Sequence, residues 1–379
     1  MTEIAYFGHD AADAAIGRRV AALQADGIRV TGFMPRRRAH AGPEWENVDL
    51  GRTRDGAFRQ RISAVLAGAR KAAGHPALKR ADILMARNLD MLACAFDAKR
   101  RAGIDVPVVY ECLDVHRLLC RRDPVGIGLR ALEGSLLKRS CGLIVSSPGF
   151  IENHFQPRHG GHPHTYLLEN RMEEASGLGP RPGTSVSSPE APLKIGWVGN
   201  LRCQRSFDLL LALADRFGEA VEIQLHGAPA RLEIPVFEPE IDRRANVSFH
   251  GRYRAPWDLA ELYAPLDLVW AGDFMEAGFN SVWLLPNRLY EGGYFGVPAI
   301  APAGTQTAEW IRARECGFVI GEPLEASLSA CVAGLLEDRR PLHAAADALQ
   351  KRPRSDFIAP KGEMRSMIDE ILNRTGRSA

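Results

Sequence analysis

The sequence predicts an α/β protein made of two domains, each a parallel β-sheet covered by helices. The chain has 379 residues, enough for two domains of roughly 150 residues each. Short apolar runs alternate with stretches of helical period in both halves, and this alternation is typical of parallel sheets. Residues 177–192 contain four prolines and three glycines, a composition typical of a linker. We therefore expect two Rossmann-like units joined by that segment.

The first half supplies the elements of one sheet. Its short apolar runs predict strands at Ile4–Gly8, Ile28–Met34, Ile83–Ala86, Val106–Glu111 and Gly142–Ser146. Stretches of helical period between the strands predict helices at Asp13–Ala25, Phe58–Ala73, Met91–Arg101 and Leu129–Arg139. The first helix is expected to begin at Asp13, because an acidic side chain is favourable at a helix N-terminus.

The second half repeats the pattern. It predicts strands at Leu193–Val198, Val221–His226, Val247–His250, Leu266–Ala271, Pro298–Ala301 and Phe318–Ile320. Its predicted helices are Phe207–Arg216, Leu259–Tyr263, Asn287–Phe295 and Thr307–Arg314. Parallel sheets bind ligands beyond the carboxyl ends of their strands, and in a two-domain protein these ends can face a central cleft. Such a cleft suits the joining of a nucleotide-bound donor to an acceptor.

These patterns set the expected domain boundaries. The first domain spans residues 1–176 and the linker 177–192. The second domain spans residues 193–352. The remaining segment, 353–379, contains the amphipathic stretch Glu363–Arg374, which we expect to form a helix that packs back on the first domain.

Composition excludes several classes of protein. No window approaches ~18 uninterrupted apolar residues, and the start MTEIAYFGHD is unlike a signal peptide, so a cytoplasmic protein is expected. The seven cysteines are odd in number, and none has C-x-x-C spacing, which argues against a disulfide framework or a zinc cage. No D-x-D pair stands in a metal-binding context, so no bound metal and no separate cofactor are expected.

Charge divides unevenly along the chain. Residues 1–172 hold 26 Lys and Arg against 18 Asp and Glu, whereas the remainder is acidic. A basic first half could attract an anionic membrane surface or a phosphate-bearing acceptor. The alternative is a solvated, arginine-rich surface with no partner. Nothing in the pattern indicates nucleic-acid binding.

Three segments of the second half carry a resemblance to known proteins. They are IGWVGNLRCQRSFDLLL, VSFHGRYRAPWDLAELYAPLDLVWAG and LPNRLYEGGYFGVPAIAPAGTQTAEWI. Together they resemble glycosyltransferases of the GT-B fold, especially bacterial exopolysaccharide transferases related to glycosyltransferase family 4. In the first half, MTEIAYFGHD and VVYECLDVH resemble the opening strand and the acceptor-side loop of succinoglycan-type transferases.

The resemblance implies a reaction. It implies transfer of a hexose from a nucleotide-sugar, with a UDP-sugar favoured, to a saccharide acceptor in exopolysaccharide or cell-surface glycan biosynthesis. The expected acceptor is linked to a lipid diphosphate, which would place the protein at the inner face of the membrane. The resemblance also implies metal-independent chemistry with retention of anomeric configuration.

Glu291 is the main candidate for donor binding. It lies one turn into the helix expected after Pro286. In the resembled family the matching glutamate binds the ribose of the nucleotide, and free N–H groups at Asn287 and Arg288 could hold donor phosphate. An acid that merely stabilises its own first helical turn is the structural alternative. The family often has a second glutamate seven residues earlier, where this chain has Leu284; Glu276 or Asn280 could replace it.

A basic loop after the first strand of the second half is the candidate diphosphate site. Gly199 and Asn200 lead into the loop, and Arg202 and Arg205 offer guanidinium groups that bind phosphate in a bidentate way. Two exposed loop arginines without a ligand are the alternative.

A second glycine turn, Gly251-Arg252-Tyr253, matches the turn that contacts the nucleotide base in the resembled family. Tyr253 could stack on that base. A surface turn without a ligand is the alternative.

Candidate catalytic and acceptor-binding residues come from the first half. Asp114 and His116 follow a buried strand, and the histidine could bond a sugar hydroxyl or carry a proton. A helix-capping Asp and a surface His are the alternative. His9 and Asp10 end the first strand and are candidates for acceptor binding.

Other functions fit less well or remain open. A nicotinamide dehydrogenase needs G-x-G-x-x-G in its first β–α turn, and FGHDAAD lacks it. A sugar-nucleotide 2-epimerase shares the GT-B fold and binds the same nucleotide. A catalytically inactive GT-B-like nucleotide-binding protein is the non-enzyme alternative, and Leu284 in place of an acid favours it.

Overall fold

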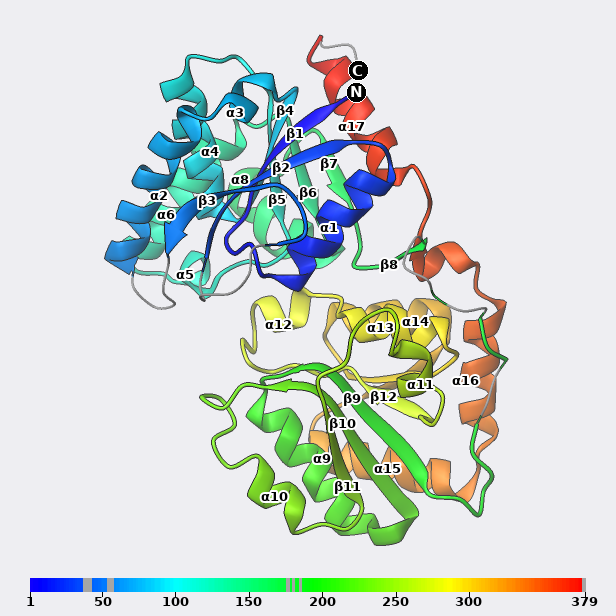
Figure 1. Ribbon diagram of the computed structural model, residues 1–379. Coiled ribbons are helices and arrows are strands. Elements are labelled where there is room, and N and C mark those ends of the chain that lie inside the picture. Colours follow the sequence, from blue (N-terminus) through cyan, green and yellow to red (C-terminus); the bar gives the residue numbers. More distant parts are fainter. Residues whose placement is uncertain (37–42, 53–57, 175–177, 179–180, 184–185, 377–379) are drawn as a thin grey trace. The chain divides into compact units, whose positions relative to one another are not determined.

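The fold is described from a computed structural model, which describes residues 1–36, 43–52, 58–174, 178, 181–183 and 186–376. The chain divides into two compact units (Figure 1). Met1–Glu169 and Pro360–Ala379 form the first, and Asn170–Ala359 forms the second. Each unit is an α/β structure built on one large parallel sheet, which confirms the predicted fold class.

The first unit contains a seven-stranded sheet in the order β3-β2-β1-β4-β5-β6-β7. Every neighbouring pair is parallel. The strands are β1 Glu3–Phe7, β2 Arg29–Arg36, β3 Asn47–Arg52, β4 Ile83–Arg87, β5 Val108–Cys112, β6 Gly142–Val145 and β7 Thr165–Leu167. The strand order reverses between β1 and β4, and the carboxyl ends at such a switch point are where open α/β sheets bind ligands.

Helices cover both faces of this sheet (Figure 1). They are α1 Ala14–Ala25, α2 Phe58–Ala73, α3 Pro76–Arg80, α4 Leu89–Ala102, α5 Arg117–Cys120, α6 Pro124–Leu137, α7 Pro148–Phe150, a π-helical turn Ile151–Phe155, α8 Gln156–His159 and α17 Glu363–Arg374. The predicted cap is present, since Asp13 accepts a hydrogen bond from the Ile16 N–H. The C-terminal helix α17 buries Met367 and Ile368 in one cluster with Ile16 and Val20 of α1.

The second unit contains a six-stranded parallel sheet in the order β11-β10-β9-β12-β13-β14. The strands are β9 Leu193–Leu201, β10 Val221–Pro229, β11 Val247–Gly251, β12 Leu268–Trp270, β13 Ala299–Pro302 and β14 Gly317–Ile320. Its switch point lies between β9 and β12. A separate two-stranded sheet pairs β8 Met172–Glu173 with β15 Ile358–Ala359.

Two apolar clusters bury the two faces of this sheet. The helices are α9 Gln204–Phe217, α10 Glu238–Asp242, α11 Leu259–Tyr263, α12 Asn280–Trp283, α13 Asn287–Tyr294, α14 Gln306–Arg314, α15 Leu324–Glu337 and α16 Arg340–Lys351, with 3₁₀ turns at Gly218–Ala220 and Arg354–Asp356. Leu328 of α15 packs with Leu210 of α9 on one face, and Tyr290 of α13 packs with Trp310 of α14 on the other.

The chain passes between the two compact units at two points, each seven residues from the predicted domain boundary. The first passage lies after Glu169 rather than after residue 176, and the second lies after Ala359 rather than after residue 352. Strands β8 and β15 pair with each other, and Met172 and Ile358 belong to an apolar cluster of the second unit, so both crossing segments lie with that unit. The predicted linker, 177–192, falls partly outside the described residues. Among those residues, every helix is too short or too polar to span a lipid bilayer.

Candidate functional site

Two glycines lie side by side at the carboxyl ends of β9 and β10. Gly199 and Gly227 are partners in the β9–β10 register and have φ angles of +118° and +137°. A Cβ on Gly227 would lie 1.7 Å from the Gly199 carbonyl oxygen, so no side chain fits there. Strand β9 continues to Leu201, which corrects the predicted strand end at Val198 and places Gly199 and Asn200 within the strand.

Arg288, in the first turn of α13, crosses the switch point of the second sheet. Its guanidinium donates to the carbonyl oxygens of Val198, at 3.4 Å, and Gly272, at 3.1 Å. The side chain is 9% exposed, and its Nε is buried without a hydrogen-bond partner among the described residues. A Cβ on Gly199 would lie 3.8 Å from Nη1 of Arg288, so the arginine borders the open backbone of that glycine.

Burial of Arg288 is incompletely compensated. Desolvation lowers the pKa of its guanidinium, against the opposing effect of the Asp273 carboxylate. Asp273 itself pairs with Arg202, whose Nη2 lies 3.1 Å from Oδ2. Burial would raise the pKa of Asp273, but chiefly the charge of Arg202 holds it below its usual value. Two guanidinium groups, those of Arg202 and Arg288, therefore lie near one carboxylate, that of Asp273, at the carboxyl ends of β9 and β12.

Glu291 lies one helical turn after Arg288 and is also buried, at 5% exposure. Its Oε2 accepts a hydrogen bond of 3.0 Å from the Tyr263 hydroxyl, which comes from α11. Burial, reinforced by the Glu291 charge, raises the pKa of Tyr263 well above its usual value, so the phenol stays a donor. Gly293 allows α13 to pack closely, since a Cβ there would lie 2.4 Å from the ring of Phe357.

Tyr253 belongs to the same neighbourhood, whereas Arg252 is exposed. Gly251 ends β11 with a φ of +75°, and the turn after it leads to Tyr253. Tyr253 is half-buried and packs against the apolar cluster that contains Tyr263. It also lies close enough to influence the ionisation of both Tyr263 and Arg288. The turn thus presents an aromatic ring beside the buried groups.

Arg205 occupies a different environment from Arg202. The predicted basic loop is wrong at this position, because α9 begins at Gln204 after Cys203, whose Sγ accepts the cap hydrogen bond from the Ser206 N–H. Arg205 is exposed on that first turn, pairs with Glu322 at 3.1 Å and stacks over Phe274 at 4.7 Å.

The residues proposed to replace the missing acid lie in the segment after β12. The backbone N–H of Glu276 donates to the Ser281 hydroxyl at 2.9 Å. Asn280 is 3% exposed and begins α12. Asn287 is half-buried at the start of α13, where the N-cap residue Pro286 makes no side-chain cap hydrogen bond. These residues lie in the same unit as Glu291, in the segment that follows the carboxyl end of β12.

The candidates of the first unit lie at the carboxyl ends of β1 and β5. His9 contacts Asp13 at 3.6 Å and Asn88 at 3.4 Å. Asp10 accepts a hydrogen bond from the Ala12 N–H. Asp114 and His116 are both exposed, and Nδ1 of His116 accepts a hydrogen bond from the Leu118 N–H.

The histidine, and not the aspartate, thus caps the short helix α5. The alternative interpretation expected a helix-capping Asp114 and a surface His116, but the capping residue is His116. Tyr263, Asp13 and Asn88 were missed as neighbours of the candidate residues. Their proximity depends on which strands and helices are adjacent, and no local motif carries that information.

The chain is 44% identical over 329 residues to the succinoglycan biosynthesis protein ExoL of Rhizobium meliloti (strain 1021), which covers 84% of this chain and 81% of ExoL. No protein-family profile matches the chain.

Two solved structures share its fold over nearly their whole length. One is the sucrose-phosphate synthase from Thermosynechococcus elongatus, with a TM-score of 0.71, 14% identity and 99% coverage of both chains. The other is Anabaena Alr3699/HepE in complex with UDP-glucose, with a TM-score of 0.69, 15% identity, and coverage of 99% of this chain and 100% of that one. At these identities the likeness establishes the architecture alone, which is the GT-B fold.

Proposed function

Because the chain belongs to the family of the succinoglycan biosynthesis protein ExoL, we propose that it is a glycosyltransferase of exopolysaccharide synthesis. It moves a hexose from a nucleotide-sugar to a saccharide acceptor. The observation that carries the proposal is the buried guanidinium of Arg288, which lies at the switch point of the second sheet beside the open backbone of Gly199.

The diphosphate of the donor is assigned to this edge of the second sheet. Arg288 and Arg202 supply positive charge, and the uncapped N-terminus of α13 supplies free N–H groups. The Gly199–Gly227 pair removes the side chains that would keep a phosphate away from the backbone. Arg205 is a weaker candidate, because it is exposed and paired with Glu322.

The nucleoside is assigned to residues around Glu291. A carboxylate accepts hydrogen bonds from both ribose hydroxyls, and the Tyr263 hydroxyl fixes its orientation. Tyr253 stacks on the base. Asn200, Gly251, Arg252, Glu276, Asn280 and Asn287 are assigned to the surroundings of the donor. HepE was solved with UDP-glucose, which supports a UDP-sugar as donor.

In the proposed reaction the bond between the anomeric carbon and the diphosphate oxygen breaks. A bond forms from that carbon to an acceptor hydroxyl oxygen, whose proton leaves for a nearby base. The departing diphosphate gains negative charge, and Arg288 and Arg202 stabilise that charge as fixed cations. Family 4 resemblance supports retention of configuration and a reaction that does not depend on a metal.

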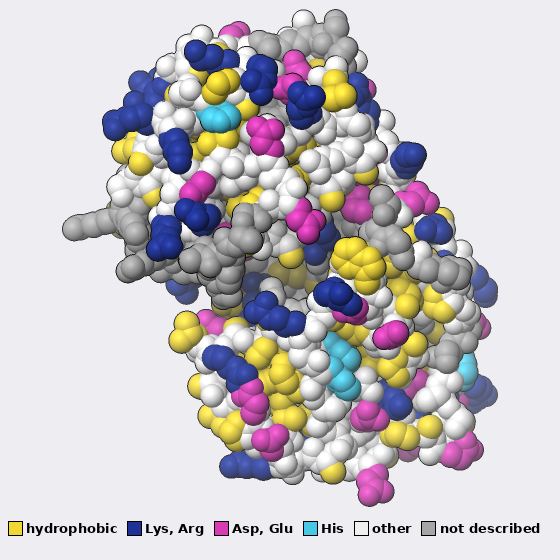
Figure 2. Space-filling model, viewed as in Figure 1, with side chains coloured by type: hydrophobic (Ala, Val, Ile, Leu, Met, Phe, Trp, Pro, Cys, Tyr) yellow, Lys and Arg dark blue, Asp and Glu magenta, His cyan; other side chains and the backbone are white. Residues whose placement is uncertain are grey.

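The first unit is assigned the acceptor, with Asp114 and His116 in the proton path and His9 and Asp10 on the saccharide. A lipid-diphosphate-linked acceptor at the inner face of the cell membrane is proposed from the basic balance of residues 1–172. Figure 2 shows basic side chains spread over the visible face of this unit, with fewer acidic ones among them.

Incubation of the purified chain with UDP-, GDP- and dTDP-sugars tests the proposal. Transfer to a lipid-linked saccharide, or slow donor hydrolysis without acceptor, is the expected result. Interconversion of donors would instead establish the 2-epimerase. Tight nucleotide binding with no turnover, in the presence of lipid-linked acceptors, would establish the inactive binding protein.

A further inference from the structure

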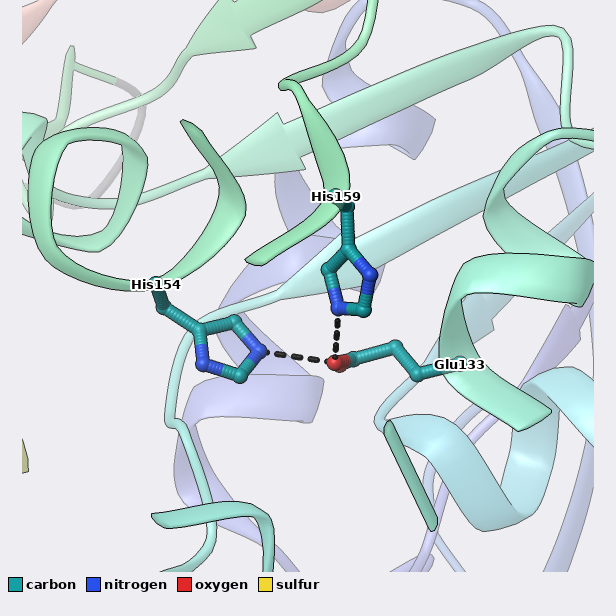
Figure 3. A group of neighbouring side chains, drawn as sticks. All are labelled: Glu133, His154 and His159. Atoms are coloured by element: carbon teal, nitrogen blue, oxygen red, sulfur yellow. Dashed lines mark hydrogen bonds and ion pairs between the residues drawn. The ribbon is translucent and has the colours of Figure 1, made fainter. Parts of the chain in front are cut away.

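A buried carboxylate in the first unit receives two imidazole side chains on one oxygen atom (Figure 3). Oε2 of Glu133, on α6, lies 2.7 Å from Nε2 of His154 and 2.8 Å from Nε2 of His159. The side chains of Glu133 and His154 are fully buried, and that of His159 is 6% exposed. The three atoms that could act as ligands all lie within 4.8 Å of one another.

We propose that Glu133, His154 and His159 bind a divalent transition-metal ion, for which Zn²⁺ suits the donor set, and that the ion cross-links α6 to the segment 151–159. Two imidazole nitrogens and one carboxylate oxygen are an established set of zinc ligands. Tetrahedral bonds of about 2.0–2.1 Å separate the ligand atoms by ~3.3 Å. Each of the two present contacts therefore has to open by about 0.6 Å, which side-chain rotation can supply.

The surroundings orient two of the three ligands. The Tyr110 hydroxyl donates to Oε1 of Glu133 at 3.0 Å, which leaves Oε2 directed at the imidazoles. Such outer contacts fix the ligands of metal sites. Gly134 makes room for His159, because a Cβ there would lie 2.9 Å from Nδ1 of that histidine. A side chain at position 134 would push His159 away from Glu133.

Of the three proposed ligands, His159 borders a neighbouring cavity. His159 and Gly134 line a cavity of about 1100 Å³ that extends along α6 to the residues before β7. A water from this cavity can complete a tetrahedral shell. The ion is thus placed as a structural brace with one solvent ligand, and no step of the proposed transfer passes through it.

Two features limit the expected affinity. Nδ1 of His154 is buried without a hydrogen-bond partner among the described residues, and loss of such an outer partner typically weakens metal binding 10–100-fold. The cavity wall is also basic, with Arg130, Lys138, Arg139 and Arg158, which opposes a cation. We therefore expect micromolar rather than nanomolar binding of zinc.

Sequence inspection does not find this cluster. Glu133 precedes His154 by 21 residues, and only the packing of α6 against the π-helical turn and α8 brings the three together. His154 and His159 have the H-x4-H spacing of some zinc motifs, but the cysteine pair that accompanies it in those motifs is missing, and the third ligand lies 21 residues upstream.

The test uses the full chain, stripped with EDTA, dialysed and titrated with ZnCl₂ by calorimetry. One zinc per chain with micromolar Kd is expected, together with a rise in Tm of several degrees at a 100-fold excess over Kd. His159→Ala and the nearly isosteric Glu133→Gln should weaken binding at least 30-fold. The control variants His162→Ala and His164→Ala, which alter histidines of the same cavity outside the cluster, should bind as the wild type does.

Circular dichroism of the metal-free variants shows whether they remain folded. A variant that unfolds is replaced by Gly134→Ala, which displaces His159 without removing a ligand and should weaken zinc binding. The proposal is overturned if the folded wild type takes up less than 0.1 equivalent at 100 µM zinc. It is also overturned if His159→Ala binds as well as the wild type, since the zinc would then sit on surface histidines.

Discussion

The two sheets handle buried charge at their switch points in opposite ways. In the first unit, Glu111 at the end of β5 accepts hydrogen bonds from Tyr6 at 2.5 Å, Arg19 at 2.8 Å and Arg87 at 2.7 Å. In the second unit, Arg288 donates to two carbonyl oxygens and keeps a buried, unpartnered Nε. The first charge is matched by ion pairs inside the protein, whereas the carboxylate nearest to Arg288, that of Asp273, is already paired with Arg202.

This difference separates a stabilising cluster from a binding group. A buried ion pair is costly to break, because removal of one partner strands the other charge away from water. A buried cation without an ionic partner contributes little to stability and gains most from an anionic ligand. We therefore expect substitutions at Glu111 to affect folding, and substitutions at Arg288 to affect donor binding.

The largest expected effect tests the first half of this comparison. Glu111→Ala leaves Arg19 and Arg87 buried without their carboxylate, and should lower the free energy of unfolding by about 3–5 kcal/mol. Urea denaturation measures the loss. Glu3→Ala is the control, since its pairs with Arg29 and Arg80 lie near the surface and contribute at most about 1 kcal/mol. Equal losses in the two variants would contradict the assigned role of the cluster.

Acidification should lower the stability of the second unit at a higher pH than that of the first. Burial, with help from the charge of His250, lowers the pKa of His226 to about 4 from an ordinary 6.5. The unfolded chain then binds a proton that the folded one excludes. The stability contributed by neutral His226 is fully present above pH 6.5. As the pH drops to 4, the free energy of unfolding falls by at most about 3 kcal/mol.

Glu111 behaves differently in the same titration. Burial would raise its pKa, but chiefly the charges of Arg87 and Arg19 hold it at about 2. The unfolded carboxyl group gains its proton near pH 4.5, so the stability contributed by this cluster is lost only between pH 4.5 and 2.

Tryptophan fluorescence reports mainly the second unit, which holds five of the six tryptophans, and should change first. His226→Gln should remove the change between pH 6.5 and 4; its persistence would refute the assignment.

Arg288→Met tests the second half of the comparison. Loss of a charged hydrogen bond to the diphosphate should weaken UDP binding by about 10–100-fold, corresponding to about 1.5–3 kcal/mol. The melting temperature should stay within a few degrees of the wild type, because no internal ion pair is broken. Arg205→Ala is the matched control and should change UDP affinity less than threefold. A large fall in stability for Arg288→Met would assign this arginine to folding instead.

The smallest effect concerns the orientation of Glu291. Tyr263→Phe removes the hydroxyl that donates to its carboxylate. Since one neutral-to-charged hydrogen bond is lost while the ring stays in place, donor affinity should fall by about 3–10-fold. Calorimetry with UDP measures the change. An unchanged Kd would show that the carboxylate is held by other contacts.

The sequence predicted the fold class because both halves alternate strands and helices regularly. It missed β3, whose Asn47–Arg52 mixes polar and apolar residues at an edge, and the helices α15 and α16. Within the site, the position of Glu291 one turn after the start of α13 was predictable, because Pro286 marks the beginning of that helix in the sequence. The role of Arg288 as a bridge from β9 to the end of β12 was not, because it depends on strand adjacency across 90 residues.

Calorimetric titration of UDP and of uridine into the wild type, Arg288→Met and Glu291→Gln tests the donor site most directly. If Arg288 holds the diphosphate and Glu291 the ribose, the first variant should lose at least 10-fold in affinity for UDP while its affinity for uridine stays within twofold. The second variant should lose affinity for both ligands. Equal losses of UDP and uridine in Arg288→Met, or unchanged UDP binding in both variants, would contradict the assignment.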